Sequence, residues 1–195
     1  DYIIASDTDS VYINMAPLVK MTGATDKSKI VKALDKFCSE RLEPYITKCY
    51  DELGNYMNVY ENKMVMKREA IADKGIWTAK KRYILNVHNS EGVQYPEPKL
   101  KIMGIEAVKT STPLPCRDKL KEAFKVIMGG DQKEMKEFIV NFRRDFELLP
   151  PEDIAFPRSV NGVNKYGDTT SIYKKGTPIH VKGALLYNHL LKTKK

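Results

Sequence analysis

Two short β-prone runs flank an acidic pentapeptide at the start of the chain. The runs cover residues 2–5 and 11–13, and residues 6–10 between them have the sequence Ser-Asp-Thr-Asp-Ser. Apolar runs of this length joined by a few polar residues predict a β-hairpin with a tight turn. Residues two apart on an extended chain point to the same side, about 6.5–7 Å apart. We therefore expect Asp7 and Asp9 to project together from the hairpin.

Paired carboxylates on an exposed turn repel each other unless a cation lies nearby. Mg²⁺ is commonly bound by one or two carboxylates together with phosphate oxygens. Two such ions, about 3.5–4 Å apart, can activate a 3′-hydroxyl and stabilise a leaving pyrophosphate. An Asp-x-Asp triplet also occurs in solvated turns and in glycosyltransferases that bind a nucleotide sugar through a metal. The apolar runs on both sides make the two-metal interpretation more specific here.

The positive charge of the chain is concentrated in two blocks. The net charge is +8, and residues 63–109 contain ten basic against five acidic residues, while residues 158–195 contain eight against one. Blocks of one sign are expected for a protein with a polyanionic partner. A basic face that is merely solvated is the alternative, and the basic blocks count against the glycosyltransferase option.

The rest of the chain predicts an α+β fold. Apolar residues at helical spacing indicate a long helix over residues 25–53, capped by Asp26 or Thr25 and kinked or split at Pro44. Residues 63–87 predict an antiparallel meander that begins at 64–66, followed by a turn at 88–92. The predicted architecture for residues 1–110 is an antiparallel sheet backed by the long helix.

The second part of the chain is predicted to be mostly helical. We place the boundary near Pro113, and helices over residues 117–128 and 132–149 are expected to pack as a hairpin. Residues 152–177 are predicted to be irregular, and a last helix is predicted over residues 181–191. Domain boundaries of 1–110 and 111–195 follow from this pattern.

Cysteine usage and hydropathy limit the environment of the protein. Three cysteines without C-x-x-C spacing, Cys38, Cys49 and Cys116, argue against a disulfide framework or a zinc site and predict buried thiols in a reducing compartment. No apolar run is long enough to span a bilayer. The first residues contain no basic region leading into an apolar stretch, so we expect no secretory signal. We therefore expect a cytoplasmic protein with no membrane partner.

The motif at residues 7–10 resembles the third palm motif of the family B DNA polymerases, Tyr-Gly-Asp-Thr-Asp-Ser. Ser6 stands where that family usually has glycine. Further segments resemble the replicative polymerases of T-even-type tailed phages, namely residues 66–72, 77–83, 97–104 and 161–183. The similarity thus covers nearly the whole chain. It implies a palm portion over residues 1–110 and a thumb portion over residues 111–195 of a DNA-directed DNA polymerase.

The resemblance also implies catalytic roles. Asp9 would be the main metal-ligating carboxylate of a two-metal Mg²⁺ site, Asp7 its neighbour and Glu69 an accessory carboxylate. An ion pair of Glu69 with Arg68 or Lys67 at the surface is the alternative. The family's site also needs an earlier palm aspartate and a fingers lysine that binds the deoxynucleoside triphosphate. We therefore expect this chain alone to be inactive and to need the remaining palm, fingers and exonuclease segments in cis or in trans.

Two sets of residues are candidates for contact with primer–template DNA. The first matches the family's Lys-Lys-x-Tyr element and a neighbouring element, and consists of Lys80, Lys81, Arg82, Tyr83, Lys99 and Lys101. On a strand, Lys80 and Arg82 would share one face and Lys81 and Tyr83 the other. The second set belongs to the predicted thumb and consists of Lys165, Tyr166, Lys174, Lys175, His180 and Lys182.

Contacts of this kind can bind phosphates without reading the base sequence. A basic strand edge that discourages aggregation is the alternative for the first set, and loop solubility is the alternative for the second. A non-catalytic module that binds duplex DNA would use the same residues and is the competing functional hypothesis. We expect Trp77 to be a core residue.

Overall fold

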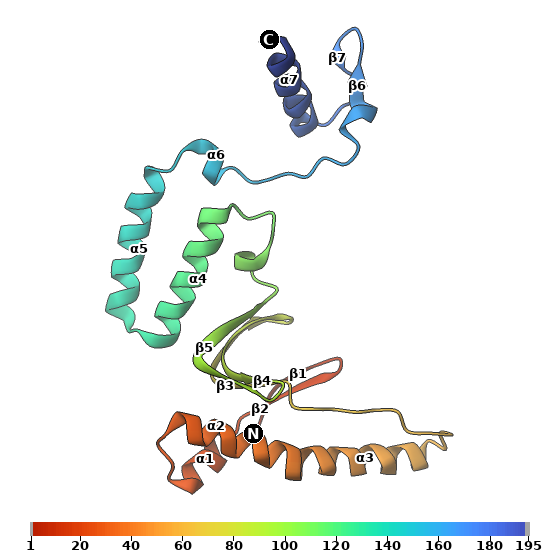
Figure 1. The fold of residues 1–195 in the computed structure, drawn as a ribbon, viewed down its shortest axis with the longest axis vertical. Coiled ribbons are helices and arrows are strands. Elements are labelled where there is room, and N and C mark those ends of the chain that lie inside the picture. The colour runs from red at the N-terminus through yellow and green to blue at the C-terminus, as the bar shows by residue number, and fades with distance from the viewer. Residues whose placement is uncertain (1, 194–195) are drawn as a thin grey trace.

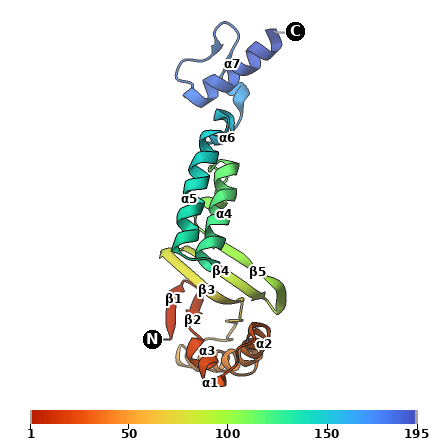
Figure 2. The same ribbon diagram turned by 90° about the vertical axis from the view of Figure 1, so that its left-hand side faces the viewer.

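The computed structural model describes residues 2–193, which form an elongated molecule. In chain order it consists of a small sheet with helices beneath it, a helical hairpin, and a C-terminal unit joined by an extended segment (Figure 1). The view in Figure 2 shows the sheet between the N-terminal helices on one side and the helical hairpin on the other. The predicted α+β fold with an antiparallel sheet is confirmed.

The acidic pentapeptide closes a β-hairpin, as predicted. Strand β1 (Ile3–Asp7) pairs antiparallel with β2 (Ser10–Ile13). Asp7 lies opposite Ser10, so the two remaining residues, Thr8 and Asp9, form the turn. The two carboxylates therefore lie at the tip of a two-stranded ribbon.

The predicted long helix is present but changes its type before Pro44. Helix α2 (Lys27–Phe37) continues through a π-helical turn, η1 (Cys38–Leu42), into α3 (Glu43–Tyr56). Proline cannot donate an intrahelical hydrogen bond, so it is best tolerated in the first turn of a helix, and Pro44 lies in the first turn of α3. The helix runs on past the predicted stop to Tyr56.

The start of α2 also matches the prediction, since the Asp26 side chain accepts a hydrogen bond of 3.0 Å from the Lys29 N–H. A further helix, α1 (Ala16–Thr22), was not predicted. It is only seven residues long, which is too short to show a clear hydrophobic period.

The meander is confirmed as a three-stranded antiparallel sheet in the order β3–β4–β5. Its strands are β3 (Ala70–Ala79), β4 (Arg82–Ser90) and β5 (Val93–Met103). Two details of the prediction are wrong. Residues 64–66 belong to no strand, and residues 88–90 end β4 instead of forming a turn. The turn needs only Glu91 and Gly92, because both have positive φ angles of 49° and 87°.

Each face of the sheet is covered by a different layer. On one face, Ile84 of β4 packs with Ile105 and Met128 in the main buried cluster. On the other face, Leu85 of β4 and Val31 of α2 line a common cavity. Alternation along β4 thus gives the sheet two apolar faces, as expected for a strand covered on both sides.

The predicted helical hairpin consists of α4 (Leu114–Gly129) and α5 (Gln132–Glu147). A capping box begins α5, because the Asp131 side chain accepts from the Glu134 N–H while the Glu134 carboxylate accepts from the Asp131 N–H. The α4 helix contributes Met128 to the cluster at Ile84 and so joins the hairpin to the sheet.

The C-terminal region is more structured than the sequence predicts. After the short helix α6 (Pro151–Ile154), an extended segment leads to a small unit (Figure 1). That unit comprises η3 (Val163–Tyr166), β6 (Gly167–Asp168), β7 (Ile172–Tyr173) and α7 (Ile179–Thr193). The last helix was predicted slightly too short. Across residues 2–193, no helix combines the length and the apolar character that crossing a membrane would require.

Candidate functional site

The site is built from two hairpin turns, one acidic and one basic. The turn between β1 and β2 presents Asp7 and Asp9, and the turn between β3 and β4 presents Lys80 and Lys81. The Asp7 Oδ1 atom lies 3.7 Å from the Lys81 Nζ atom. A shallow depression of about 250 Å³ lies between the turns and is lined by Asp7, Thr8, Asp9, Ser10, Tyr12, Lys81, Tyr83 and Met103.

Both turns contain a non-glycine residue in the left-handed region. Thr8 has a φ of 52° and Lys81 a φ of 62°. This region is unusual for a β-branched residue such as threonine, and residues held there typically cost about 1–3 kcal/mol. Local hydrogen bonds hold the acidic turn, since Thr8 Oγ1 donates to Asp7 Oδ1 at 3.0 Å and Ser10 Oγ donates to the Asp7 carbonyl at 3.1 Å.

The prediction that Lys80 and Lys81 lie on opposite faces of a strand is wrong. Ala79 pairs with Arg82, so Lys80 and Lys81 are the two turn residues and only Arg82 and Tyr83 belong to β4. The reason is that the apolar residues of the two strands pair directly across the hairpin, which leaves the lysines at its tip. Both lysines are consequently exposed, and the Lys81 side chain reaches Asp7 of the acidic turn.

An aromatic cluster joins the two hairpins. The Tyr12 ring lies 5.4 Å from the ring centroids of both Trp77 and Tyr83, and the Trp77 and Tyr83 rings lie 6.5 Å apart. Burial raises the pKa of the Tyr83 hydroxyl, and Tyr12 and the negative charges of Glu69 and Asp7 raise it further. Tyr83 therefore stays a neutral hydrogen-bond donor. Trp77 is half-buried in this cluster.

Glu69 lies just before β3 and forms an ion pair with Lys101 of β5. The alternative partner, Arg68, instead binds Asp35 of α2 through its guanidinium group, and the Arg68 N–H donates to the Glu43 carboxylate at 2.9 Å. The Glu69 carboxylate is thus paired with Lys101, another candidate site residue, and not with the side chain of its sequence neighbour Arg68. The Glu69 side chain is 62% exposed, so its carboxylate is accessible to a ligand other than Lys101.

Lys99 and Arg82, the other basic candidates on the sheet strands, also have partners. The Lys99 Nζ atom lies 4.2 Å from the centroid of the Tyr95 ring. The Arg82 Nη2 atom lies 3.7 Å from Glu106 Oε1. Lys99 and Lys101 are two residues apart on β5, opposite Val87 and Leu85 of β4, and so share one face of the strand.

The donor set at the acidic turn fits a magnesium site only in part. Within residues 2–193, no three carboxylate, imidazole or thiol groups converge as ligands for a metal ion. Asp7 and Asp9 provide two carboxylates, which meet the minimum that Mg²⁺ uses when phosphate oxygens and water complete its shell. Lys81 already provides a positive charge 3.7 Å from Asp7, so a metal ion at Asp7 would compete with this lysine.

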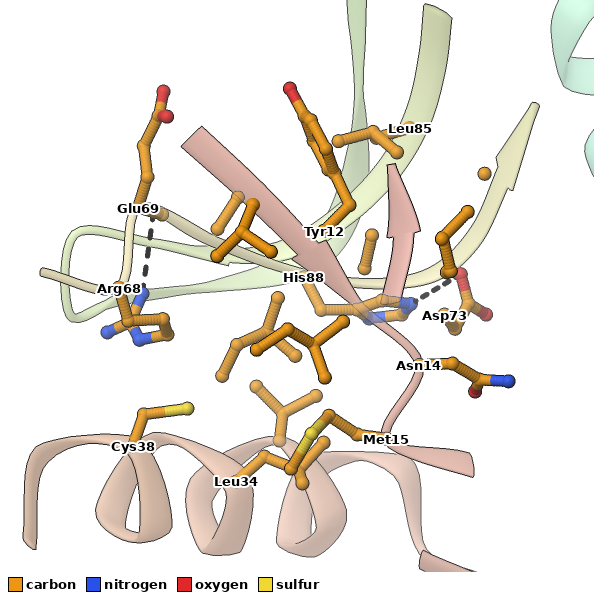
Figure 3. A pocket seen from close by; sticks show the side chains of 18 of the residues that line it. Tyr12, Asn14, Met15, Leu34, Cys38, Arg68, Glu69, Asp73, Leu85 and His88 are labelled. Carbon is orange, nitrogen blue, oxygen red and sulfur yellow. Dashed lines mark hydrogen bonds and ion pairs between the residues drawn. The ribbon is translucent and has the colours of Figure 1, made fainter. Parts of the chain in front are cut away.

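A cavity of about 840 Å³ lies between the β1–β2 ribbon, α2 and the sheet (Figure 3). Its wall is mostly apolar, with Leu34 and Cys38 of the helix facing Leu85 across it. Burial raises the pKa of the Cys38 thiol. All three cysteines are free, as predicted, but only Cys38 is buried and Cys49 is exposed, so the expectation of buried thiols fails for Cys49.

A polar cluster centred on Asp73 lies at the edge of this cavity, and no sequence pattern predicted it. The Asp73 carboxylate accepts hydrogen bonds from Lys27 Nζ at 2.9 Å and Asn86 Nδ2 at 2.8 Å, and His88 Nε2 lies 3.2 Å away (Figure 3). Burial alone would raise the pKa of Asp73, but these three groups outweigh it and lower the pKa to about 2. The cluster therefore contains an aspartate that is ionised at neutral pH and ties α2 to the sheet.

The second basic set lies in the C-terminal unit, separate from the sheet (Figure 1). Lys165 lies over the Tyr166 ring at 4.9 Å and Lys182 over the Tyr173 ring at 5.2 Å. Lys174 Nζ donates to the Lys165 carbonyl at 3.0 Å. Lys175 and His180 are exposed. All six predicted residues lie within the C-terminal unit.

The chain matches proteins of one class over nearly all of its length. It is homologous to a segment of DNA-directed DNA polymerases, as its motifs indicate. It is 35% identical to the DNA-directed DNA polymerase of Enterobacteria phage T4 over 96% of the chain, and 38% identical to that of Escherichia phage RB69 over 98%. The chain spans 22% of the length of each of these relatives. No protein-family model matches it.

Proposed function

We propose that the chain is part of a DNA-directed DNA polymerase and forms a portion of its palm (residues 1–110) and of its thumb (residues 111–195). The enzyme would transfer a nucleotide from a deoxynucleoside triphosphate to the 3′ end of a primer. The observation that supports this most directly is the proximity of the acidic and basic turns, with Asp7 and Lys81 3.7 Å apart. Metal-assisted phosphoryl transfer needs a carboxylate pair and a phosphate-binding surface side by side.

In this proposal, Asp9 and Asp7 bind Mg²⁺, and Glu69 is an accessory carboxylate beside them. The bound ions would stabilise negative charge on the reacting phosphates. A carboxylate from the remaining polymerase segments, the family's earlier palm aspartate, would complete the two-metal site. The exposure of the acidic turn is compatible with ligands arriving from outside the chain.

Primer–template DNA would lie along the basic turn and the end of the sheet. Lys80, Lys81 and Arg82 would contact phosphates, Tyr83 would donate from its neutral hydroxyl, and Lys99 and Lys101 would extend the contacts along β5. Lys81 and Lys101 are each paired with a carboxylate in the free chain. Binding of a phosphate to either lysine would release Asp7 or Glu69 towards the metal, which links DNA binding to metal binding.

The C-terminal unit would contact the duplex further from the primer end through its six basic and aromatic residues. Each phosphate that a basic side chain neutralises makes the slope of log affinity against log salt concentration steeper by about 0.9. Changing Lys165, Lys174, Lys175 and Lys182 together to glutamine should therefore reduce that slope by about 3–4. Fluorescence anisotropy at several salt concentrations measures the slope, and an unchanged slope would remove this unit from the DNA interface.

The chain alone is expected to be inactive, since the fingers and part of the palm come from other segments of the enzyme. An enzyme of this kind acts in the cytoplasm of the host cell. The test is primer extension after mixing the chain with a polypeptide that supplies the upstream segments. Extension should require both polypeptides and should disappear with Asp9→Ala, and robust extension by this chain alone would contradict the proposal.

A non-catalytic module that binds duplex DNA is the second candidate. The ion pair between Asp7 and Lys81 favours it, because a neutralised turn needs no metal. Mg²⁺ or Mn²⁺ titration separates the two. Site-specific binding that is lost in Asp9→Ala supports the polymerase site, whereas salt-sensitive DNA binding without any metal effect supports the module.

A further inference from the structure

Gly104 contacts the backbone of the basic turn directly. It follows the last residue of β5, where Met103 pairs with Tyr83, and it has a φ of +66°. A side chain at this position would collide with the Lys81 carbonyl oxygen, and its Cβ would lie 3.3 Å from the Lys81 carbonyl carbon and 3.2 Å from Arg82 Cγ. Only glycine allows the two backbones to approach this closely.

The residues after Gly104 are fixed in the core. Ile105 packs with Ile84 and Met128, and Ala107 has no exposed surface. Because Ile105 is held in this cluster, the Gly104 backbone is a rigid surface against which the Lys81 carbonyl rests. The turn is thus fixed by a contact from outside its own hairpin.

The turn needs such a support. Lys81 is in the left-handed region without being glycine, and its side chain is 67% exposed, so the turn itself supplies little to hold it there. The segment after β5 also reaches the next residue, since Glu106 Oε1 lies 3.7 Å from Arg82 Nη2. Both basic residues that follow Lys80 are therefore in contact with the segment that starts at Gly104.

We propose that Gly104 is a positioning residue for DNA binding, which sets the backbone of Lys81 and so directs its side chain to Asp7 in the free chain and to a primer phosphate in the complex. This inference rests on the proposed function. A lysine on a fixed backbone loses less conformational entropy when it binds than one on a mobile loop. Displacing Lys81 should weaken DNA binding although no charge changes.

Gly92 is a matched control at the other end of the same strand. It precedes β5 at the opposite end, has a φ of +87°, and would place a Cβ in open space. Gly104→Ala and Gly92→Ala therefore share the backbone strain of a left-handed alanine, while only Gly104→Ala displaces the Lys81 carbonyl. The difference between the variants isolates the contact with the basic turn.

The experiment measures binding of a primer–template duplex with a recessed 3′ end by fluorescence anisotropy at several salt concentrations. Gly104→Ala should weaken binding by roughly 3–10-fold and reduce the salt slope by about 1, as for the loss of one phosphate contact. Gly92→Ala should bind like the unchanged chain. Equal binding by the two variants, whether both normal or both weakened, overturns the inference.

A double variant distinguishes this inference from the proposed function. If Gly104 acts through Lys81, adding Gly104→Ala to Lys81→Ala should cause little further loss, whereas additive losses overturn the inference. If Lys81→Ala alone leaves DNA binding unchanged, the role of Lys81 in the proposed function fails instead. Amide chemical shifts of Lys81 and Arg82 in NMR spectra should move in Gly104→Ala and stay constant in Gly92→Ala.

If Gly104→Ala does not fold, an extra glycine inserted between Lys80 and Lys81 provides the test. Insertions at exposed turns are well tolerated, and this one moves Lys81 away from Gly104 without a collision. It should weaken DNA binding and reduce the salt slope in the same way. Unchanged binding by the insertion variant overturns the inference.

Discussion

Asp7 and Asp73 both lie in the first 110 residues, but they differ in the number of groups that contact their carboxylates. Asp73 accepts from Lys27 and Asn86 at 2.9 and 2.8 Å, lies 3.2 Å from His88, and has its pKa lowered to about 2. Asp7 has one lysine at 3.7 Å and a hydroxyl from the next residue, at a turn with unfavourable backbone geometry. Asp73 is thus held by several partners that join α2 to the sheet, whereas Asp7 has few partners, as the proposed metal site requires.

The largest expected effect is on catalysis at the acidic turn. In the reconstituted enzyme, Asp9→Ala should reduce primer extension by about 10³-fold or more, because a metal ligand is lost where charge develops in the transition state. The free energy of unfolding of the Asp9→Ala variant should stay within about 0.5 kcal/mol of that of the unchanged chain, because Asp9 is exposed. Rates of single-nucleotide extension measure the activity, and urea unfolding curves measure the stability. A stable, fully active Asp9→Ala variant would contradict the proposed role of Asp9.

Asp73→Ala should have the reverse effect. It leaves Lys27 and Asn86 without their acceptor and removes a link between α2 and the sheet, which should cost about 2–3 kcal/mol of unfolding free energy. Metal binding at the acidic turn should be unaffected. Urea unfolding measures the loss, and a loss below about 0.5 kcal/mol would show that the Asp73 cluster does not stabilise the fold.

The stabilisation by Asp73 should also depend on pH. Its pKa is about 2 in the folded chain, below the value of 3.8 that is usual for an aspartate. The stabilising effect is therefore fully present above about pH 4 and is lost as the pH falls towards about 2. Since the side chain is 24% exposed, solvent screening reduces the effect to about 1–2 kcal/mol. The difference in unfolding free energy between the unchanged chain and Asp73→Asn should shrink over this window, and a difference that is constant with pH would contradict the assignment.

The smallest expected effect concerns the strained turn. Thr8→Gly removes the left-handed threonine and should raise the free energy of unfolding by up to about 1 kcal/mol. The gain is limited because glycine adds entropy to the unfolded chain and the hydroxyl contact with Asp7 is lost. Thermal unfolding measures the change, and Thr22→Gly in helix α1 serves as a control that should be destabilising. A loss of stability in Thr8→Gly would show that the turn is unstrained.

The sequence predicted what depends on local pattern. Alternating and helical spacing identified the acidic hairpin, the meander and the helices on either side of Pro44, because each is encoded by contiguous residues. The motif also identified Asp7, Asp9 and the basic residues as one candidate set. These predictions needed no knowledge of distant contacts.

What the sequence did not predict depends on pairing between distant segments. The placement of Lys80 and Lys81 in a turn follows from the register of β3 against β4, and a shift of one residue changes the face of every side chain. The Asp73 cluster joins α2 to β3 and β4, with Lys27 46 positions away from Asp73 in the chain. The contact of Gly104 with Lys81 likewise joins the end of β5 to another hairpin.

Manganese-induced NMR line broadening tests the central claim most directly, because paramagnetic Mn²⁺ broadens only the signals of nearby nuclei. In the unchanged chain, added Mn²⁺ should broaden the amide signals of Thr8, Asp9 and Ser10 first, and primer–template DNA should strengthen the effect. In Asp9→Ala the same signals should stay sharp, while Asp73→Asn should behave like the unchanged chain. Broadening that persists in Asp9→Ala, or that centres on Asp73, would contradict a divalent-metal site at the acidic turn.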